Sequence, residues 1–122
     1  MGNYYKTILK FSYSPHEAFE KELNILEFLE WTYKSNEPDT IIAYTSLSAF
    51  GLGEKITIVF GHDQMHISSE SQYPFQLFDL GKNESNVDKF LNIFRRARLP
   101  FNESDFADEK PKSIIERYLR GR

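Results

Sequence analysis

Cysteine is absent from the 122 residues, and so are long apolar runs. Without cysteine the chain can form no disulfide, no cysteine-ligated metal site and no thiol nucleophile, which suits a reducing compartment. The longest apolar runs, such as residues 56–60, have the length of a strand and fall far short of the roughly 20 residues that span a bilayer. The N-terminal residues also lack the pattern of a signal peptide. We therefore expect a cytoplasmic protein without a membrane span.

Motifs that carry a definite chemistry are missing as well. The loop at residues 46–53 has neither the lysine of a phosphate-binding loop nor the following helix of a dinucleotide fingerprint. Two histidines flank a predicted turn, where solvated side chains are commoner than a metal site. Three serines lack the histidine and aspartate that would activate a serine nucleophile. These residues are His62, His66, Ser68, Ser69 and Ser71. The sequence predicts no catalytic residue, no metal ion and no cofactor.

Charge is distributed unevenly along the chain. Residues 1–88 carry 6 basic and 13 acidic side chains, a balance of −7, whereas residues 89–122 carry 9 basic and 5 acidic side chains, a balance of +4. The acidic body argues against a nucleic-acid partner. All six arginines follow Phe94, and those in the last turn of a helix suit its dipole, so a solvated helix face is their simplest explanation.

The first third of the chain predicts a strand and a helix. Residues 4–13 alternate as a strand does, and Ser14, Pro15 and Glu17 form a helix start with an N-cap, a proline at the first position and a capping box. The apolar periodicity extends this helix to about Lys34 or Ser35. Phe28 and Trp31 fall outside the apolar face, among charged residues of the opposite side. We expect both aromatic side chains to face outward.

Three strands and a second helix follow in the predicted order. The strands cover residues 40–47, 54–60 and 65–71, and a short turn joins the last two as a hairpin. The segment from Asp79 to Asn83 predicts a corner in which Gly81 has a positive φ and neighbouring side chains bond turn amides. The second helix begins near Asn83 or Ser85, with Ser85 and Asp88 spaced as a weaker capping box.

This order predicts an α+β fold with two layers. We expect a mostly antiparallel four-stranded sheet, in the order β-α-β-β-β-α, with both helices on one face. Residues 1–98 form this single domain, and residues 99–122 form a connector followed by a short amphipathic helix at residues 113–120. Such a short helix needs a surface to dock on, either on the same domain or on a partner.

Several short stretches resemble a known pattern. They are the segments at residues 14–18, 53–58, 67–71 and 76–86, which carry GE-x-I-x-I, S-x-S and Q-x-x-D-x-GKN-x-x-N. This pattern is similar to that of a small, uncharacterised bacterial domain, over roughly residues 4–98. The resemblance supports the fold and implies no activity and no catalytic residue.

Three functions remain open at this point. The first is a non-catalytic protein-interaction domain whose partner is another protein or a second copy of the chain in a homodimer. Its candidate contact residues are Phe28, Trp31, Ile115, Tyr118 and Leu119. The second is a small-molecule or lipid binder with a pocket between sheet and helices. The third is an enzyme that uses the corner, whose candidate structural residues are Asp79, Gly81, Lys82, Asn83 and Asn86.

Overall fold

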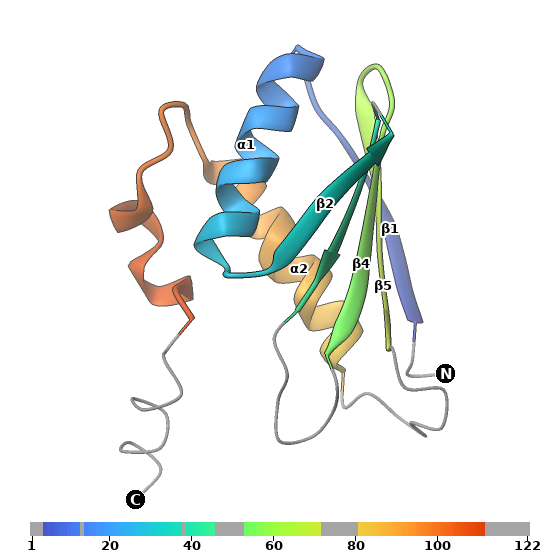
Figure 1. Ribbon diagram of the computed structural model, residues 1–122. Helices are drawn as coiled ribbons and strands as arrows, with labels where there is room; N and C mark the ends of the chain where they lie inside the picture. Colours follow the sequence, from blue (N-terminus) through green and yellow to red (C-terminus); the bar gives the residue numbers. More distant parts are fainter. Residues whose placement is uncertain (1–3, 13, 38, 46–52, 72–80, 112–122) are drawn as a thin grey trace, which may run out of the picture.

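The structure is a computed structural model that describes residues 4–12, 14–37, 39–45, 53–71 and 81–111 (Figure 1). The elements in chain order are β1 (Tyr4–Lys10), α1 (Pro15–Phe28), β2 (Thr32–Glu37), β3 (Thr40–Tyr44), β4 (Glu54–Phe60), β5 (Gln64–Ser71), α2 (Lys82–Arg96) and the 3-10 helix η1 (Glu103–Glu109). The predicted α+β class is confirmed. The predicted strand at residues 4–13 is shorter than expected and ends at Lys10.

Within the described residues the strands form one open five-stranded sheet. Its order is β1-β5-β4-β3-β2, and every neighbouring pair is antiparallel. The predicted count of four strands is wrong, because β2 adds an edge strand where the sequence predicted helix. The last four strands follow the chain as successive neighbours. The first strand pairs only with the last, so that Tyr4 lies opposite Glu70.

The end of α1 explains the additional strand. The chain leaves the helix through a Schellman motif, in which the Glu30 amide donates to the Glu27 carbonyl and the Trp31 amide donates to the Leu26 carbonyl. Glu30 takes the left-handed conformation, with φ of 62°, which glycine usually provides at this position. Periodicity alone could not reveal this stop, since the sequence carries no glycine there.

The start of α1 is as predicted. The Glu17 amide donates to the Ser14 hydroxyl at 3.1 Å, and the Ser14 amide donates to the Glu17 carboxylate at 3.4 Å. Both halves of the capping box are therefore present. At α2 the capping prediction is wrong, because the helix begins at Lys82 with Gly81 as its N-cap and no side chain caps its first turn.

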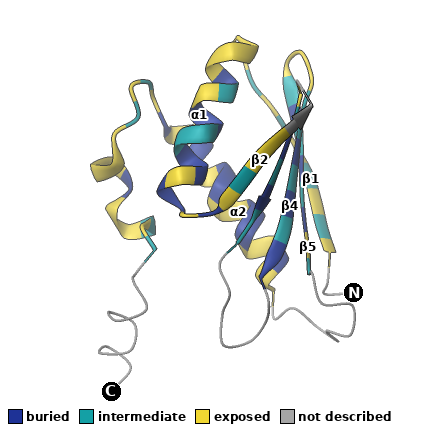
Figure 2. Cartoon of the chain, in the orientation of Figure 1, coloured by how far each residue is buried: buried dark blue, intermediate teal, exposed yellow. Residues whose placement is uncertain are grey.

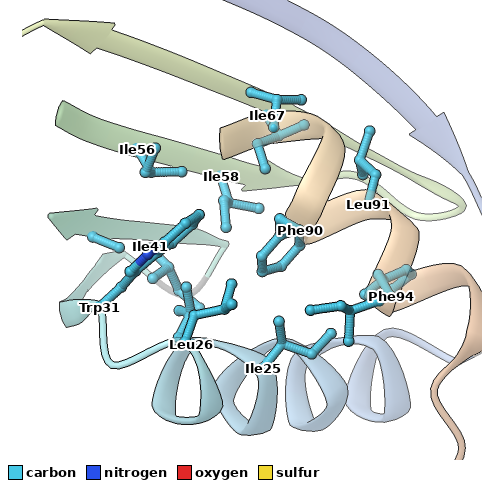
Figure 3. Close-up of a cluster of buried hydrophobic side chains, with 14 of the residues drawn as sticks. Ile25, Leu26, Trp31, Ile41, Ile56, Ile58, Ile67, Phe90, Leu91 and Phe94 are labelled. Atoms are coloured by element: carbon cyan, nitrogen blue, oxygen red, sulfur yellow. The ribbon is translucent and has the colours of Figure 1, made fainter. Parts of the chain in front are cut away.

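Both long helices lie on the same face of the sheet (Figure 1). Helix α2 packs over β1 and β5, whereas α1 contacts α2 and β2. Between them the core is filled by large apolar side chains, many of them fully buried (Figure 3). Side chains along β1, β3, β4 and β5 largely alternate between more and less buried positions, because one face of the sheet packs on the helices (Figure 2). Tyr4 and Ile8, 52% and 49% exposed, lie on the other face of β1.

The C-terminal tail, residues 99–122, does not begin with the irregular connector that the sequence predicted. Residues predicted as an irregular surface segment form η1, which lies on the side of the helices away from the sheet (Figure 1). The predicted helix at 113–120 lies outside the described residues.

Candidate functional site

The corner before α2 has the predicted backbone. Gly81 has φ of 75° and ψ of 11°, which confirms the expected positive φ. A Cβ atom built on Gly81 would meet no atom within 4 Å, so the cost of a side chain there is backbone strain alone. Lys82 is exposed and begins the helix. Asp79 lies outside the described residues.

Asn83 connects the first turn of α2 to the last part of β5. Its side chain is fully buried, its Oδ1 accepts from the Ser69 hydroxyl at 2.6 Å, and its Nδ2 donates to the Ser71 hydroxyl at 3.2 Å. Both serines lie on β5. The predicted role of Asn83 was local, within the corner, but these bonds reach across to the sheet.

Asn86 makes the second connection, one turn further along α2. Its Nδ2 donates to Glu54 Oε1 at 2.9 Å and lies 3.5 Å from the Ser69 hydroxyl. Glu54, the first residue of β4, is only 3% exposed, and its Oε1 also accepts from the Thr45 hydroxyl at 2.9 Å. The Thr45 hydroxyl in turn accepts from the Glu54 amide at 2.7 Å.

These contacts form one polar network that fixes the start of α2 on the sheet. Five polar residues of the pattern shared with the bacterial domain meet in it, namely Glu54, Ser69, Ser71, Asn83 and Asn86. Buried polar groups are stable in such a place because their partners satisfy them. The network thus offers a structural reason for the presence of these polar residues in the pattern. That the chain belongs to the bacterial domain stays a prediction.

The two predicted contact aromatics are buried. Trp31 is 8% exposed and stacks on Phe90 of α2, with ring centroids 6.4 Å apart, in the core (Figure 3). It lies past the end of α1, so a helical projection does not apply to it. Phe28 does project away from the sheet, but it is 2% exposed because residues of the tail cover it. The expectation that both face outward is wrong.

The cover over Phe28 comes from residues 101–110. The rings of Phe101 and Phe106 stack on each other and meet Phe28 edge-on, at centroid distances of 5.8 and 6.4 Å. The Lys110 ammonium lies 5.3 Å from the Phe28 ring centroid. The tail therefore docks in the same chain through these residues. The other predicted contact residues, Ile115, Tyr118 and Leu119, lie outside the described part.

A cleft opens where α1 passes the C-terminal end of α2. Its volume is about 590 Å³, and we call it the basic cleft because four of its lining side chains are cationic. The lining residues are Glu17, Lys21, Arg95, Arg96, Ala97, Arg98 and Leu99. Lys21, expected on a solvated helix face, is only 4% exposed, and its ammonium lies 5.4 Å from the Phe94 ring centroid. Lys21 therefore adds a positive charge to the arginines that line this cleft.

The arginines of the basic cleft differ in their partners. Arg96 forms an ion pair of 2.6 Å with Glu109 of η1, and its guanidinium lies 5.0 Å from the centroid of the Phe106 ring. Arg95 and Arg98 are exposed, and neither side chain has an ion-pair or hydrogen-bond partner within the described chain. The arginines stand out in the sequence, but their spacing does not indicate that the fold brings Lys21 close to them.

Glu22 is the other unusual charged residue. It lies on α1 with 0% exposure, on the face that also buries Ala18, Ile25 and Leu26. Among the residues that the structure describes, neither carboxyl oxygen has a hydrogen-bond partner. Burial raises the pKa of the Glu22 carboxyl well above its ordinary value. The spacing along α1 carries a signal for this position, because Glu22 follows Ala18 by four residues and precedes Ile25 by three.

Comparison with known proteins yields no family model, no curated protein and no solved structure that matches the chain. Function therefore has to be argued from the site itself. In the part of the chain that the structure describes, no group of three or more histidine, aspartate or glutamate side chains is placed to hold a metal ion. None of the helices described is long and apolar enough to cross a membrane.

Proposed function

We propose that the chain is a non-catalytic protein-interaction domain that binds an acidic segment of a partner protein in the basic cleft. One observation carries this proposal: Arg95 and Arg98 line the cleft together with Lys21, and within the described part of the chain neither arginine has an ion-pair or hydrogen-bond partner. The one carboxylate among the lining residues belongs to Glu17, which is engaged in the capping box of α1. Unpaired cations on one surface attract a ligand of opposite charge and fix its register.

The alternative binder, with a pocket between sheet and helices, is less well supported. That interior is occupied by side chains such as Ile58, Phe90 and Phe94, none of them more than 1% exposed. A small-molecule site requires a cavity in this position. The enzyme alternative also loses support, because Asn83 and Asn86 are bound in the polar network and Asn83 is fully buried. Both residues are thereby engaged in holding α2 on the sheet.

The overall charge favours a protein partner over a nucleic acid. The net charge of the chain is −3, and residues 1–88 carry a balance of −7. A nucleic acid would extend beyond the cleft, where the acidic side chains of the body repel its phosphates. A short acidic peptide would contact only the cleft. Self-association through another surface stays a prediction.

Binding of a defined acidic peptide tests the proposal. The probe is a fluorescein-labelled heptapeptide of alternating aspartate and glutamate, followed by anisotropy at low and moderate salt. We expect Arg95→Glu with Arg98→Glu to weaken binding at least tenfold. The matched control is Lys6→Glu with Lys34→Glu, which changes the net charge equally at exposed positions on the sheet. This control should leave binding within about twofold.

Two results would refute the proposed function. One is an equal loss of binding in both double variants, because the peptide would then sense net charge rather than the basic cleft. The other is tighter binding of a single-stranded oligonucleotide of equal charge than of the peptide, with the same dependence on Arg95 and Arg98.

A further inference from the structure

We infer that a second copy of the chain pairs with the outer edge of β1 and extends the sheet across a twofold axis. This inference goes beyond the proposed function and is independent of it, since none of residues 4–10 lines the basic cleft. It names an interaction surface, its occupant and the register in which the two strands pair.

The outer edge of β1 is regular enough to accept another strand. Within the described residues β1 has β5 as its one strand neighbour, so its other edge lies at the side of the sheet (Figure 1). β1 runs for seven residues without a register shift. The opposite edge strand, β2, is interrupted by a register shift between Ser35 and Glu37, an irregularity that protects an edge from further pairing. The two edges of the sheet therefore differ, and β1 is the one suited to pairing.

Both faces of β1 carry apolar side chains that an added strand would cover. Tyr4 and Ile8 are the two large apolar side chains that the described part of the chain leaves exposed, and both lie on the face away from the helices. Tyr5 and Leu9, on the helix side, are only partly buried (Figure 2). A strand added to an edge gains main-chain hydrogen bonds together with such side-chain contacts.

The backbone groups at the outer edge follow from the pairing with β5. The Phe11 amide donates to the Asp63 carbonyl at 2.9 Å, and this pair continues the register in which Lys10 lies opposite Gln64. Hydrogen-bonded pairs alternate along an antiparallel ladder, so the odd-numbered residues of β1 bond to β5. The even-numbered residues direct their amide and carbonyl groups to the outer edge. These residues are Tyr4, Lys6, Ile8 and Lys10.

The two lysines of β1 select the register. A twofold axis at Lys6 would set this lysine against itself, and an axis at Ile8 would set Lys6 against Lys10, so like charges oppose both registers. An axis at Thr7 pairs the whole of β1. It sets Lys6 beside Ile8 of the second copy, whose exposed side chain the lysine stem then covers. It also sets Lys10 beside Tyr4, where the ammonium meets an aromatic ring.

Opposite charges at Ile8 test the interface and its register. Ile8→Lys brings two lysines together on each side of the axis, whereas Ile8→Glu gives Lys6 an acidic partner. In sedimentation equilibrium from micromolar to submillimolar protein, the wild-type mass should approach twice the 14.4 kDa of one chain. We expect Ile8→Lys to weaken dimerisation by about tenfold or more and Ile8→Glu to leave it within about threefold. The net charge of −3 would by itself favour the opposite order.

The matched control is Val59→Lys. Val59 lies in the same row on the same face, across His66 from Ile8, but on the central strand β4. It changes the net charge as Ile8→Lys does and should leave dimerisation within about twofold. Thermal melts of the three variants identify any loss of folding.

A single cysteine tests the position of the axis. The chain has no cysteine of its own. Thr7 would face Thr7 of the second copy as a non-hydrogen-bonded pair, with Cα atoms about 4.5 Å apart, a distance that a disulfide spans. Under mild oxidation Thr7→Cys should become a disulfide-linked dimer at protein concentrations at which Thr57→Cys stays monomeric. Thr57 is the control because it is half-buried like Thr7 but lies on β4.

Three results would overturn the inference. The first is a wild-type protein that stays monomeric at every concentration, whether the edge is then free or taken by a different chain. The second is a dimer that Val59→Lys weakens as strongly as Ile8→Lys, because the face of the sheet would then form the contact. The third is a dimer that Ile8→Glu weakens as strongly as Ile8→Lys, or one without a disulfide in Thr7→Cys, because the strands would then not pair about Thr7.

Discussion

Glu22 should make the free energy of unfolding depend on pH in a way that one substitution removes. It is 0% exposed, and both carboxyl oxygens lack hydrogen-bond partners in the described part of the chain. Burial raises its pKa in the folded protein, so the carboxyl keeps its proton to higher pH there than in the unfolded chain. The unfolded chain therefore binds fewer protons between the two pKa values, and stability falls as pH rises through that window.

The magnitude follows from linkage. The window begins near the unfolded pKa of glutamic acid, about 4.3, and each pH unit inside it costs about 1.4 kcal/mol. The protonated carboxyl makes its full contribution to the free energy of unfolding below that pH. The contribution declines above it and stops changing once the pH exceeds the raised pKa of the folded state. At pH 7 the loss from this one group cannot exceed about 4 kcal/mol. The unbonded polar carboxyl costs a further 1 to 3 kcal/mol or so at every pH.

Two variants separate these contributions. Glu22→Gln keeps a buried polar side chain but cannot ionise, so its stability relative to the wild type should rise with pH from about pH 4 upward. Glu22→Met also removes the polar group and should be more stable than Glu22→Gln throughout. Urea unfolding at a series of pH values, followed by the fluorescence of the buried Trp31, measures the differences. Glu20→Gln, an exposed change on the same helix, is the control.

A constant stability difference between Glu22→Gln and the wild type from pH 4 to pH 8 would refute this reasoning. It would mean that the carboxyl has the same proton affinity in the folded and unfolded states, as a hydrated or ion-paired group would.

Four further substitutions test the packing. Glu30→Gly should raise the melting temperature, whereas Gly81→Ala should cost about 1 kcal/mol, because both positions have positive φ; equal effects of the two would contradict this. Asn86→Ala should lower the free energy of unfolding by about 1 to 3 kcal/mol, as it leaves a buried carboxylate short of a donor; a neutral result would show the network to be dispensable. Phe106→Ala should cost about 3 kcal/mol and expose Phe28, detected by dye binding; an unchanged melt would argue against docking of the tail.

The predictions that held are those in which a local signal was enough. Ser14 and Glu17 specify the helix start within four residues, and Gly81 alone allows the left-handed corner without strain. The class of fold followed from periodicity and from the hairpin between β4 and β5. In each case the residues that carry the signal are neighbours along the chain.

The predictions that failed needed contacts between distant residues. Glu30 in a left-handed conformation ends α1 because the Trp31 side chain gains a place in the core, a tertiary effect that overrides propensity. Lys21 was expected on the solvated side of the helix, yet the fold buries it. Phe28 was placed on the correct face, but its cover comes from residues far along the chain.

The position of β1 in the sheet sets an order of events during synthesis. β1 leaves the ribosome first, yet its partner in the described sheet is β5, so it waits until the chain has been made past Ser71. Strands β2 to β5, by contrast, can pair as each hairpin is completed. Until β5 is available, β1 has no strand to pair with in the described sheet. The nascent chain should therefore depend on chaperones most strongly just before β5 emerges.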